Sequence, residues 1–344
     1  MRRFAFLATL ALAGPAAGEA QVLGPDELCS DYDGSAIATF ADADLEAAVG
    51  AALSVSERED LTCGLVSGLT ALSASGPGPI RYVSGSPEWP DPDRAFESLS
   101  GMQNLTGLTR LTMNNRWITD ISALRGLTNL TVLNLHTNWI SDLSPLSGMT
   151  KLTSLFLSEN PITDIGPLRE MRELTVLRLH RHGDFIGGQR PRNFMGARRL
   201  LHTNAITDIS PLAGLTKLTD LNIHTHEVSD LGPLRGLTNL TELRLAGNPV
   251  TDISPLRGLT SLRTLELTGT LVTDLRPLSG LPDILYIDLR YNADLSDIQP
   301  LLDNPGIGPG DIVELRLTSV TCNDQARLAA KGVEVRTELF SACR

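Results

Sequence analysis

Residues 127–148 read LTNLTVLNLHTNWISDLSPLSG, and this stretch decides the fold. With Leu127 as position 1, apolar residues fall at positions 1, 4, 7, 9, 14, 17 and 20, Asp at position 16 and Gly at position 22. This spacing follows neither the period of a helix nor the alternation of a strand. The stretch is therefore interpreted as one supersecondary unit, which predicts further copies along the chain.

The same spacing recurs over residues 105–303. Units begin at residues 105, 127, 149, 171, 193, 215, 237, 259 and 281, which predicts nine registers. The pattern is degenerate at residues 181–200, although Leu179 and Leu201, both at position 9, remain 22 residues apart. This break is interpreted as a decayed repeat, a pair of compensating frameshifts in the gene, or a specialised loop.

Each position of the unit has a structural role. Positions 7 and 9 point inward from a short strand and positions 6, 8 and 10 point outward, because side chains alternate across a strand. Asn at position 12 is expected to bond buried loop amides and carbonyls. The following Asp-Ile-Ser-Pro-Leu, as at residues 252–256, is expected to place Ser at the cap of a short helical or 3₁₀ segment. The position-12 asparagines are Asn138, Asn160, Asn204, Asn248 and Asn292.

The pattern L-x-x-L-x-x-L-x-L-x-x-N-x-I-x-D-I-x-x-L-x-G resembles the 22-residue leucine-rich repeats of the internalin type, over about residues 105–303. The resemblance implies an α/β solenoid: a right-handed horseshoe with a parallel concave β-sheet, short 3₁₀ or helical convex segments and a cap at each end. It also implies function by binding another protein on the concave face. Residues 40–49, FADADLEAAV, resemble the helical start of the cap in exported bacterial proteins of this kind.

Residues 1–20 have the order of a secretory signal peptide. Arg2 and Arg3 precede an apolar run, and small residues follow that run. No later apolar stretch reaches the ~20 residues of a membrane-spanning helix. We therefore expect a periplasmic or secreted monomer without a membrane span.

Two regions outside the repeats are predicted to be caps. Residues 21–104 are expected to hold a helix and a Gly/Pro-rich loop, and residues 304–344 a helix between two strands. The four cysteines of the chain lie in these regions, and in an exported protein they are expected to form disulfides. The favoured pairing joins the two cysteines at each end, because the array keeps its ends apart. These pairs are Cys29 with Cys63 and Cys322 with Cys343.

Composition and motifs narrow the function. A net charge of -11 disfavours nucleic acid and anionic lipid as partners. The sequence has no G-x-S-x-G, Walker loop, H-E-x-x-H or dinucleotide fingerprint, so neither an enzyme nor a cofactor is expected. We therefore predict an exported, non-catalytic module that binds a protein or peptide.

The binding residues are predicted on the concave face and its rim. Trp117 and Trp139 share position 13 of adjacent repeats, with Phe156 on the neighbouring strand. Tryptophan is typical of interface anchors, although packing of the two rings on each other is an equal alternative. The outward charges mix signs, and the acids of the C-terminal half predict a site for a basic segment. These charged residues are Arg110, Arg178, Arg198, Arg244, Arg290, Asp220, Glu242, Glu266 and Asp288.

The six histidines all fall at positions 10 or 12. Residues at one position of successive repeats lie about 4.7 to 4.9 Å apart in a parallel ladder. His180, His202 and His224 are therefore predicted to form a column that is a candidate transition-metal site. Duplication of the repeat explains the same column without a function. The alternative function is a metal- or small-ligand-binding envelope protein that uses this column.

Overall fold

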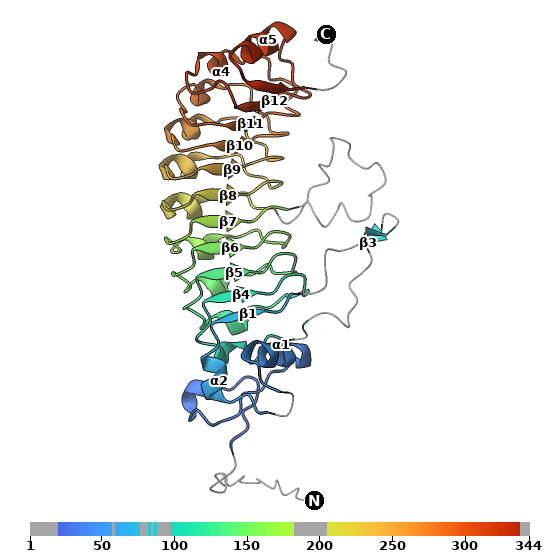
Figure 1. Cartoon of the computed structure of the whole chain (residues 1–344), viewed down its shortest axis with the longest axis vertical. Coiled ribbons are helices and arrows are strands. Elements are labelled where there is room, and N and C mark those ends of the chain that lie inside the picture. Colours follow the sequence, from blue (N-terminus) through green and yellow to red (C-terminus); the bar gives the residue numbers. More distant parts are fainter. Residues whose placement is uncertain are drawn as a thin grey trace, which may run out of the picture.

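Eleven parallel strands form a single sheet in the computed structural model (Figure 1). The structure describes residues 20–56, 59–75, 82–83, 86–87, 96, 98–181 and 205–337. The predicted signal peptide lies outside these residues, apart from Ala20. Neighbours in the sheet follow the chain order, so each successive strand lies beside the last. This arrangement is the expected leucine-rich-repeat solenoid.

Each strand of the large sheet is three residues long, and the strands within residues 105–303 are centred on position 7 of a repeat. Consecutive strands pair in register, as in Leu111 with Leu133 and Leu133 with Leu155. A separate two-stranded sheet contains β2 (Tyr82–Val83) and β3 (Ser86–Pro87). The strands of the large sheet are β1 (Ala71–Ser73), β4 (Arg110–Thr112), β5 (Val132–Asn134), β6 (Ser154–Phe156), β7 (Val176–Arg178), β8 (Asp220–Asn222), β9 (Glu242–Arg244), β10 (Thr264–Glu266), β11 (Tyr286–Asp288), β12 (Ile312–Glu314) and β13 (Glu334–Arg336).

One aliphatic core runs through the stacked coils. Leu127, Leu130, Leu133 and Leu135 of the deciding stretch are 0% exposed, and the same positions are buried in the other repeats. Full burial of one such side chain contributes roughly 1.5 to 3 kcal/mol. The core is therefore continuous along the solenoid, which the 22-residue pattern predicted.

The asparagines at position 12 act as expected. The Asn138 amide nitrogen donates to the carbonyl oxygens of Met113 and Leu135, at 2.9 Å each. Its oxygen accepts the amide of Ile118 at 3.1 Å. Each asparagine thus joins one coil to the coil before it. Asn160, Asn248 and Asn292 also donate to two such carbonyls, and Asn204 lies outside the described residues.

Short 3₁₀ segments follow the asparagine, and their capping differs from the expectation. Ser144 is the first residue of its segment and caps nothing, because Asp142 accepts the Ser144 amide at 2.8 Å and its hydroxyl at 2.9 Å. The aspartate at position 16 therefore fixes the turn. The segments are η4 (Ser122–Leu124), η5 (Ser144–Leu146), η6 (Gly166–Leu168), η7 (Ser210–Gly214), η8 (Gly232–Gly236), η9 (Ser254–Gly258) and η10 (Arg276–Leu278); α4 (Gln299–Asp303) follows in the last repeat.

The prediction of nine repeats, each with its own strand, is wrong at the degenerate repeat. β7 pairs directly with β8, so Leu177 lies beside Leu221 although 44 residues separate each pair of partners along the chain. The register that begins at residue 193 therefore has no strand between them in the large sheet. Residues 182–204 lie outside the described residues.

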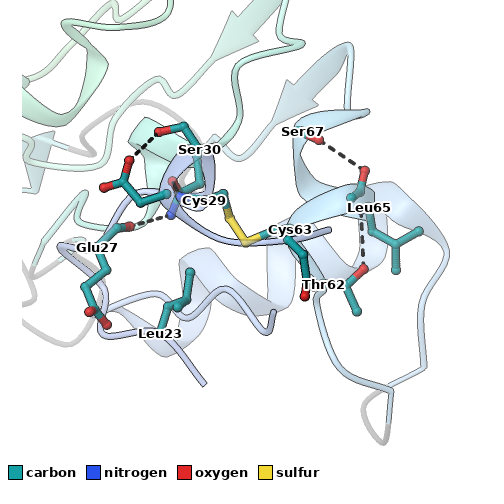
Figure 2. Close-up of a disulfide and its surroundings, with 12 residues drawn as sticks. Leu23, Glu27, Cys29, Ser30, Thr62, Cys63, Leu65 and Ser67 are labelled. Atoms are coloured by element: carbon teal, nitrogen blue, oxygen red, sulfur yellow. Dashed lines mark hydrogen bonds between the residues drawn. A yellow bond between two sulfur atoms is a disulfide. The ribbon is translucent and has the colours of Figure 1, made fainter. Parts of the chain in front are cut away.

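The caps extend the sheet at both ends. At the N-terminus, η1 (Cys29–Asp31), α1 (Ala43–Leu53) and α2 (Cys63–Ser67) precede β1 in the chain and η3 (Met102–Asn104) follows it. The predicted disulfide between Cys29 and Cys63 is present, with Cα atoms 5.4 Å apart (Figure 2). At the C-terminus, α5 (Cys322–Ala330) lies between β12 and β13. Cys322 is also disulfide-bonded, and its predicted partner Cys343 lies outside the described residues.

Candidate binding surface

The outward surface of the sheet is formed by positions 6, 8 and 10 of each repeat. The central residue of each strand is buried, and its two neighbours point to the opposite side of the sheet because side chains alternate. We call the outward residues of β4 to β7 the N-terminal face and those of β8 to β11 the C-terminal face. Trp117 and Trp139 lie in the loops that follow β4 and β5.

The two predicted tryptophans stack on each other. The ring centroids of Trp117 and Trp139 are 6.4 Å apart, with 25° between the planes. The Trp139 amide donates to the carbonyl of Ile118 at 2.8 Å, which fixes the loop. Trp139 nevertheless remains 52% exposed. The pair is thus an ordered aromatic surface whose outer side is open to solvent.

Arg178 links Phe156 of the N-terminal face to Asp220 of the C-terminal face. The Arg178 guanidinium carbon lies 5.7 Å from the centroid of the Phe156 ring, within cation–π range. Nη2 of Arg178 also donates to Oδ2 of Asp220 at 2.6 Å, from β7 to β8. Arg178 therefore contacts two other predicted binding residues, Phe156 and Asp220.

The acids of the C-terminal face are paired with arginines of the same chain. Arg244 bonds three carboxylates, which belong to Asp220 at 3.2 Å, Glu242 at 2.7 Å and Glu266 at 3.0 Å. Arg290 bonds Asp288 at 2.6 Å. A basic ligand would have to displace these arginines. Further along the sheet, Arg336 bonds Glu314 at 3.3 Å and Glu334 at 2.6 Å.

Several of the carboxylates in these ion pairs are buried, so the pairs contribute to the stability of the fold. Asp288 is only 2% exposed, and Asp220 is 8% exposed. Burial raises the pKa of Glu266, and the charge of Arg244 opposes that rise. Burial, together with the charge of Asp288, raises the pKa of Tyr286 to about 12. Breaking one partner of such a pair leaves a buried charge, which is strongly destabilising.

Arg110 differs from the other predicted arginines. Its side chain is exposed on β4, and no carboxylate of the described residues lies within ion-pair distance of it. Arg178 retains one guanidinium nitrogen, Nη1, without a hydrogen bond to the described part of the chain. The predicted Arg198 lies outside the described residues. Among the predicted arginines that the structure describes, Arg110 and Arg178 therefore have guanidinium nitrogens open to a ligand on the N-terminal face.

The histidine column has a different composition from the predicted one. His180 and His224 are direct neighbours, with ring centroids 4.6 Å apart, because β7 pairs with β8. The predicted third member, His202, lies outside the described residues. On the other side of His180, Nδ1 is 2.8 Å from the Ser158 hydroxyl oxygen and the ring centroid of His136 is 6.2 Å away. The column is His136, Ser158, His180 and His224.

His226 has a role that the sequence interpretation missed. It occupies position 12, and its Nε2 lies 2.9 Å from the carbonyl oxygen of Leu179. Its Nδ1 accepts the amide of Ile206 at 3.3 Å. These are the contacts that asparagine makes elsewhere, and here they join the two chain segments that flank residues 182–204. Histidine at an asparagine position was the signal in the sequence.

The described residues contain no group of three or more His, Cys, Asp or Glu side chains arranged to hold a metal ion. The alternative metal-binding function therefore rests on the adjacent rings of His180 and His224 alone. Among the helices in the described ranges, none has the length and hydropathy of a membrane span.

The solved structures that resemble this chain include internalin C2 of Listeria monocytogenes. The two share 31% sequence identity with a TM-score of 0.58, over 72% of this chain and 93% of internalin C2. The chain belongs to the internalin family of leucine-rich-repeat proteins. Residues 98–148 and 238–280 match the family of leucine-rich repeats (two copies). No curated protein sequence matches this internalin-family chain.

Two more distant structures share the fold. Internalin InlF of Listeria monocytogenes is 24% identical with a TM-score of 0.57, over 87% of this chain and 95% of InlF. The ectodomain of the Arabidopsis thaliana receptor kinase GASSHO1/SCHENGEN3 is 17% identical with a TM-score of 0.52, over 71% of this chain and 29% of that one. That ectodomain was solved in complex with Casparian strip integrity factor 2.

Proposed function

We propose that this chain is an exported, non-catalytic module that binds a protein or peptide on the concave face of its repeats. Leucine-rich-repeat proteins commonly mediate protein or peptide binding. The observation that carries the proposal is the stacked pair of Trp117 and Trp139, which leaves Trp139 52% exposed beside an outward sheet face. Large aromatic side chains of this kind are typical anchors of protein interfaces.

Export is supported by the disulfide and by the N-terminal sequence. The bridge between Cys29 and Cys63 is characteristic of an oxidising compartment. Residues 1–20 have the composition of a secretory signal peptide. We therefore place the binding partner outside the cytoplasm.

The test is capture of partners by the immobilised full chain from the extracytoplasmic fraction of its source cells. The double variant Trp117→Ala with Trp139→Ala is expected to lose most of a protein that the natural chain retains, because truncation of interface aromatics typically costs 2 kcal/mol or more. Its melting temperature should fall by only about 2 to 4 °C, since the rings lie at the surface.

Leu271→Ala is the matched control. Leu271 also occupies position 13 of its repeat and is 59% exposed, but it lies in the C-terminal half. This variant should retain the captured protein at the natural level. Equal retention by all three proteins would refute a role for the tryptophans.

A further inference from the structure

The N-terminal face has an unusual charge for this protein. In the four repeats that begin at residues 105, 127, 149 and 171, positions 6, 8 and 10 carry two arginines and two histidines and no carboxylate. These residues are Arg110, Arg178, His136 and His180. The whole chain has a net charge of -11. A surface without acids in such a chain attracts anionic groups.

The C-terminal face has the opposite composition. The same positions in the repeats that begin at residues 215, 237, 259 and 281 carry four carboxylates and two arginines. Both arginines, Arg244 and Arg290, already bond carboxylates of this face. These ion pairs are partly buried and leave little of the C-terminal face accessible to a ligand. On β8, for example, Asp220 and Asn222 are only 8% and 6% exposed. On the N-terminal face, by contrast, Arg110 has no carboxylate partner among the described residues, and Arg178, which bonds Asp220, keeps Nη1 without a hydrogen bond to them.

We propose that the N-terminal face binds an extended acidic peptide, with carboxylates at Arg110 and Arg178. This inference rests on the proposed function and reverses the expectation of a basic ligand. Arg110 can present its planar fork of donors to a carboxylate, which favours this pairing over a generic anion, and Arg178 can add a hydrogen bond from Nη1. Val132 of β5 and Phe156 of β6 lie on the strands between the two arginines, and Val176 lies on β7 with Arg178, so all three offer apolar contact on this face.

The spacing of the arginines specifies the peptide. Arg110 lies on β4 and Arg178 on β7, three strands apart and offset by two residues along the strands, so roughly 16 Å separates their backbones. An extended chain rises about 3.3 Å per residue, and residues two apart face the same side. Two acids four residues apart span about 13 Å, within reach of the long side chains of Arg110 and Arg178. An apolar residue between the acids can contact Phe156, which lies one strand from Arg178 and two strands from Arg110.

The test is fluorescence polarisation with two labelled nonapeptides and the full chain. In the first peptide, two glutamates four residues apart flank a central phenylalanine; in the second, lysines replace the glutamates. The glutamate peptide should bind at least 10-fold more tightly, and its Kd should rise several-fold when about 0.3 M salt screens the charges. Preference for the lysine peptide, or equal Kd values, would overturn the proposal.

Two variants locate the contact. Arg110→Glu should weaken the glutamate peptide at least 10-fold. Arg125→Glu changes the net charge equally from the opposite end of the same repeat and should leave the Kd unchanged. Equal weakening by both would show a nonspecific charge effect and overturn the site.

The outcome separates this inference from the proposed function. If neither peptide binds, and a protein captured by the natural chain is lost by the double tryptophan variant, only the acidic ligand is refuted. If that protein is retained by the double tryptophan variant as well, the proposed function itself fails.

Discussion

His226 joins the two chain segments that flank residues 182–204. Its two hydrogen bonds require the neutral ring with the proton on Nε2, because Nδ1 must accept the amide of Ile206 while Nε2 donates to Leu179. Burial is the main cause that lowers the pKa of His226, to about 4, and the charges of Arg181 and His224 add to it. The ring therefore stays neutral in the folded protein at pH values where a free histidine is charged.

This lowered pKa predicts a loss of stability in acid. Unfolding releases a histidine that titrates near pH 6.5, so the contribution is complete above that pH and is lost as the pH falls toward 4. The full loss is about 3 kcal/mol. His226→Asn should keep both hydrogen bonds without titrating, so its free energy of unfolding should match the natural chain near pH 8 and exceed it by about 2 kcal/mol near pH 4.5. Urea unfolding at the two pH values measures this.

His226→Ala is the control for the contacts themselves. It leaves the Ile206 amide and the Leu179 carbonyl buried without a partner, which should cost about 1 to 3 kcal/mol at both pH values. If the natural chain and His226→Asn lose stability in parallel as the pH falls, titration of His226 is not the cause.

At the scale of single residues, the contacts of the periodic residues were predictable from the sequence, and the contacts of the charged residues were not. The asparagines recur at one position, so their backbone partners follow from the repeat alone. The three carboxylates on Arg244 depend on how long side chains of neighbouring strands lean toward each other, which the period does not encode. The sequence therefore indicated mixed outward charges but not their neutralisation by arginines of the same face.

At the scale of elements, the N-terminal cap depends on covalent and polar links. The disulfide holds the segment that enters the cap to α2, as Figure 2 shows. Asn104 adds a second link, since its oxygen accepts the Cys29 amide at 2.8 Å and its nitrogen donates to the Glu27 carbonyl at 3.0 Å. At the start of α1, Asp42 accepts the Leu45 amide at 2.8 Å. The cap covers the first coil of the core.

Removal of this disulfide should destabilise the cap. Cys29→Ser with Cys63→Ser frees a segment with a sequence separation of 34, worth roughly 4 kcal/mol in the chain-entropy model. Limited proteolysis should then cut between residues 29 and 63 before it cuts the repeats. The natural chain under reducing conditions is the control and should behave in the same way. Unchanged protection of this segment in the variant would contradict a stabilising role for the bridge.

The elements of the caps were predictable in type but not in placement. The sequence indicated a helix near α1, and a helix between two strands at the C-terminus. It did not indicate that those strands continue the main ladder, with Ile287 beside Val313 and Val313 beside Val335. The connection from β11 to β12 is longer than one repeat, so the pairing lies outside the 22-residue period and depends on packing.

At the scale of the molecule, the sheet is continuous across the degenerate repeat. Partners in β7 and β8 are 44 residues apart, twice the repeat length. A sequence period alone cannot distinguish one coil that follows another from a segment inserted within a coil, since both keep the leucines in phase. Joining residues 171–182 to residues 205–214 gives MRELTVLRLHRHAITDISPLAG, a unit of 22 residues with every apolar position filled.

Deletion of residues 183–204 should therefore leave a complete solenoid. The variant keeps the β7–β8 pairing and the hydrogen bond between His226 and Leu179. It joins residue 182 directly to residue 205. Loop-closure entropy then favours the variant by roughly 1 to 3 kcal/mol, so its urea midpoint should equal or exceed that of the natural chain. Deletion of residues 215–236, which removes β8 and a full set of buried leucines, is the matched control of equal length and should lower the midpoint sharply. A comparable loss in both variants would mean that residues 183–204 contribute to the packed array as a coil of their own.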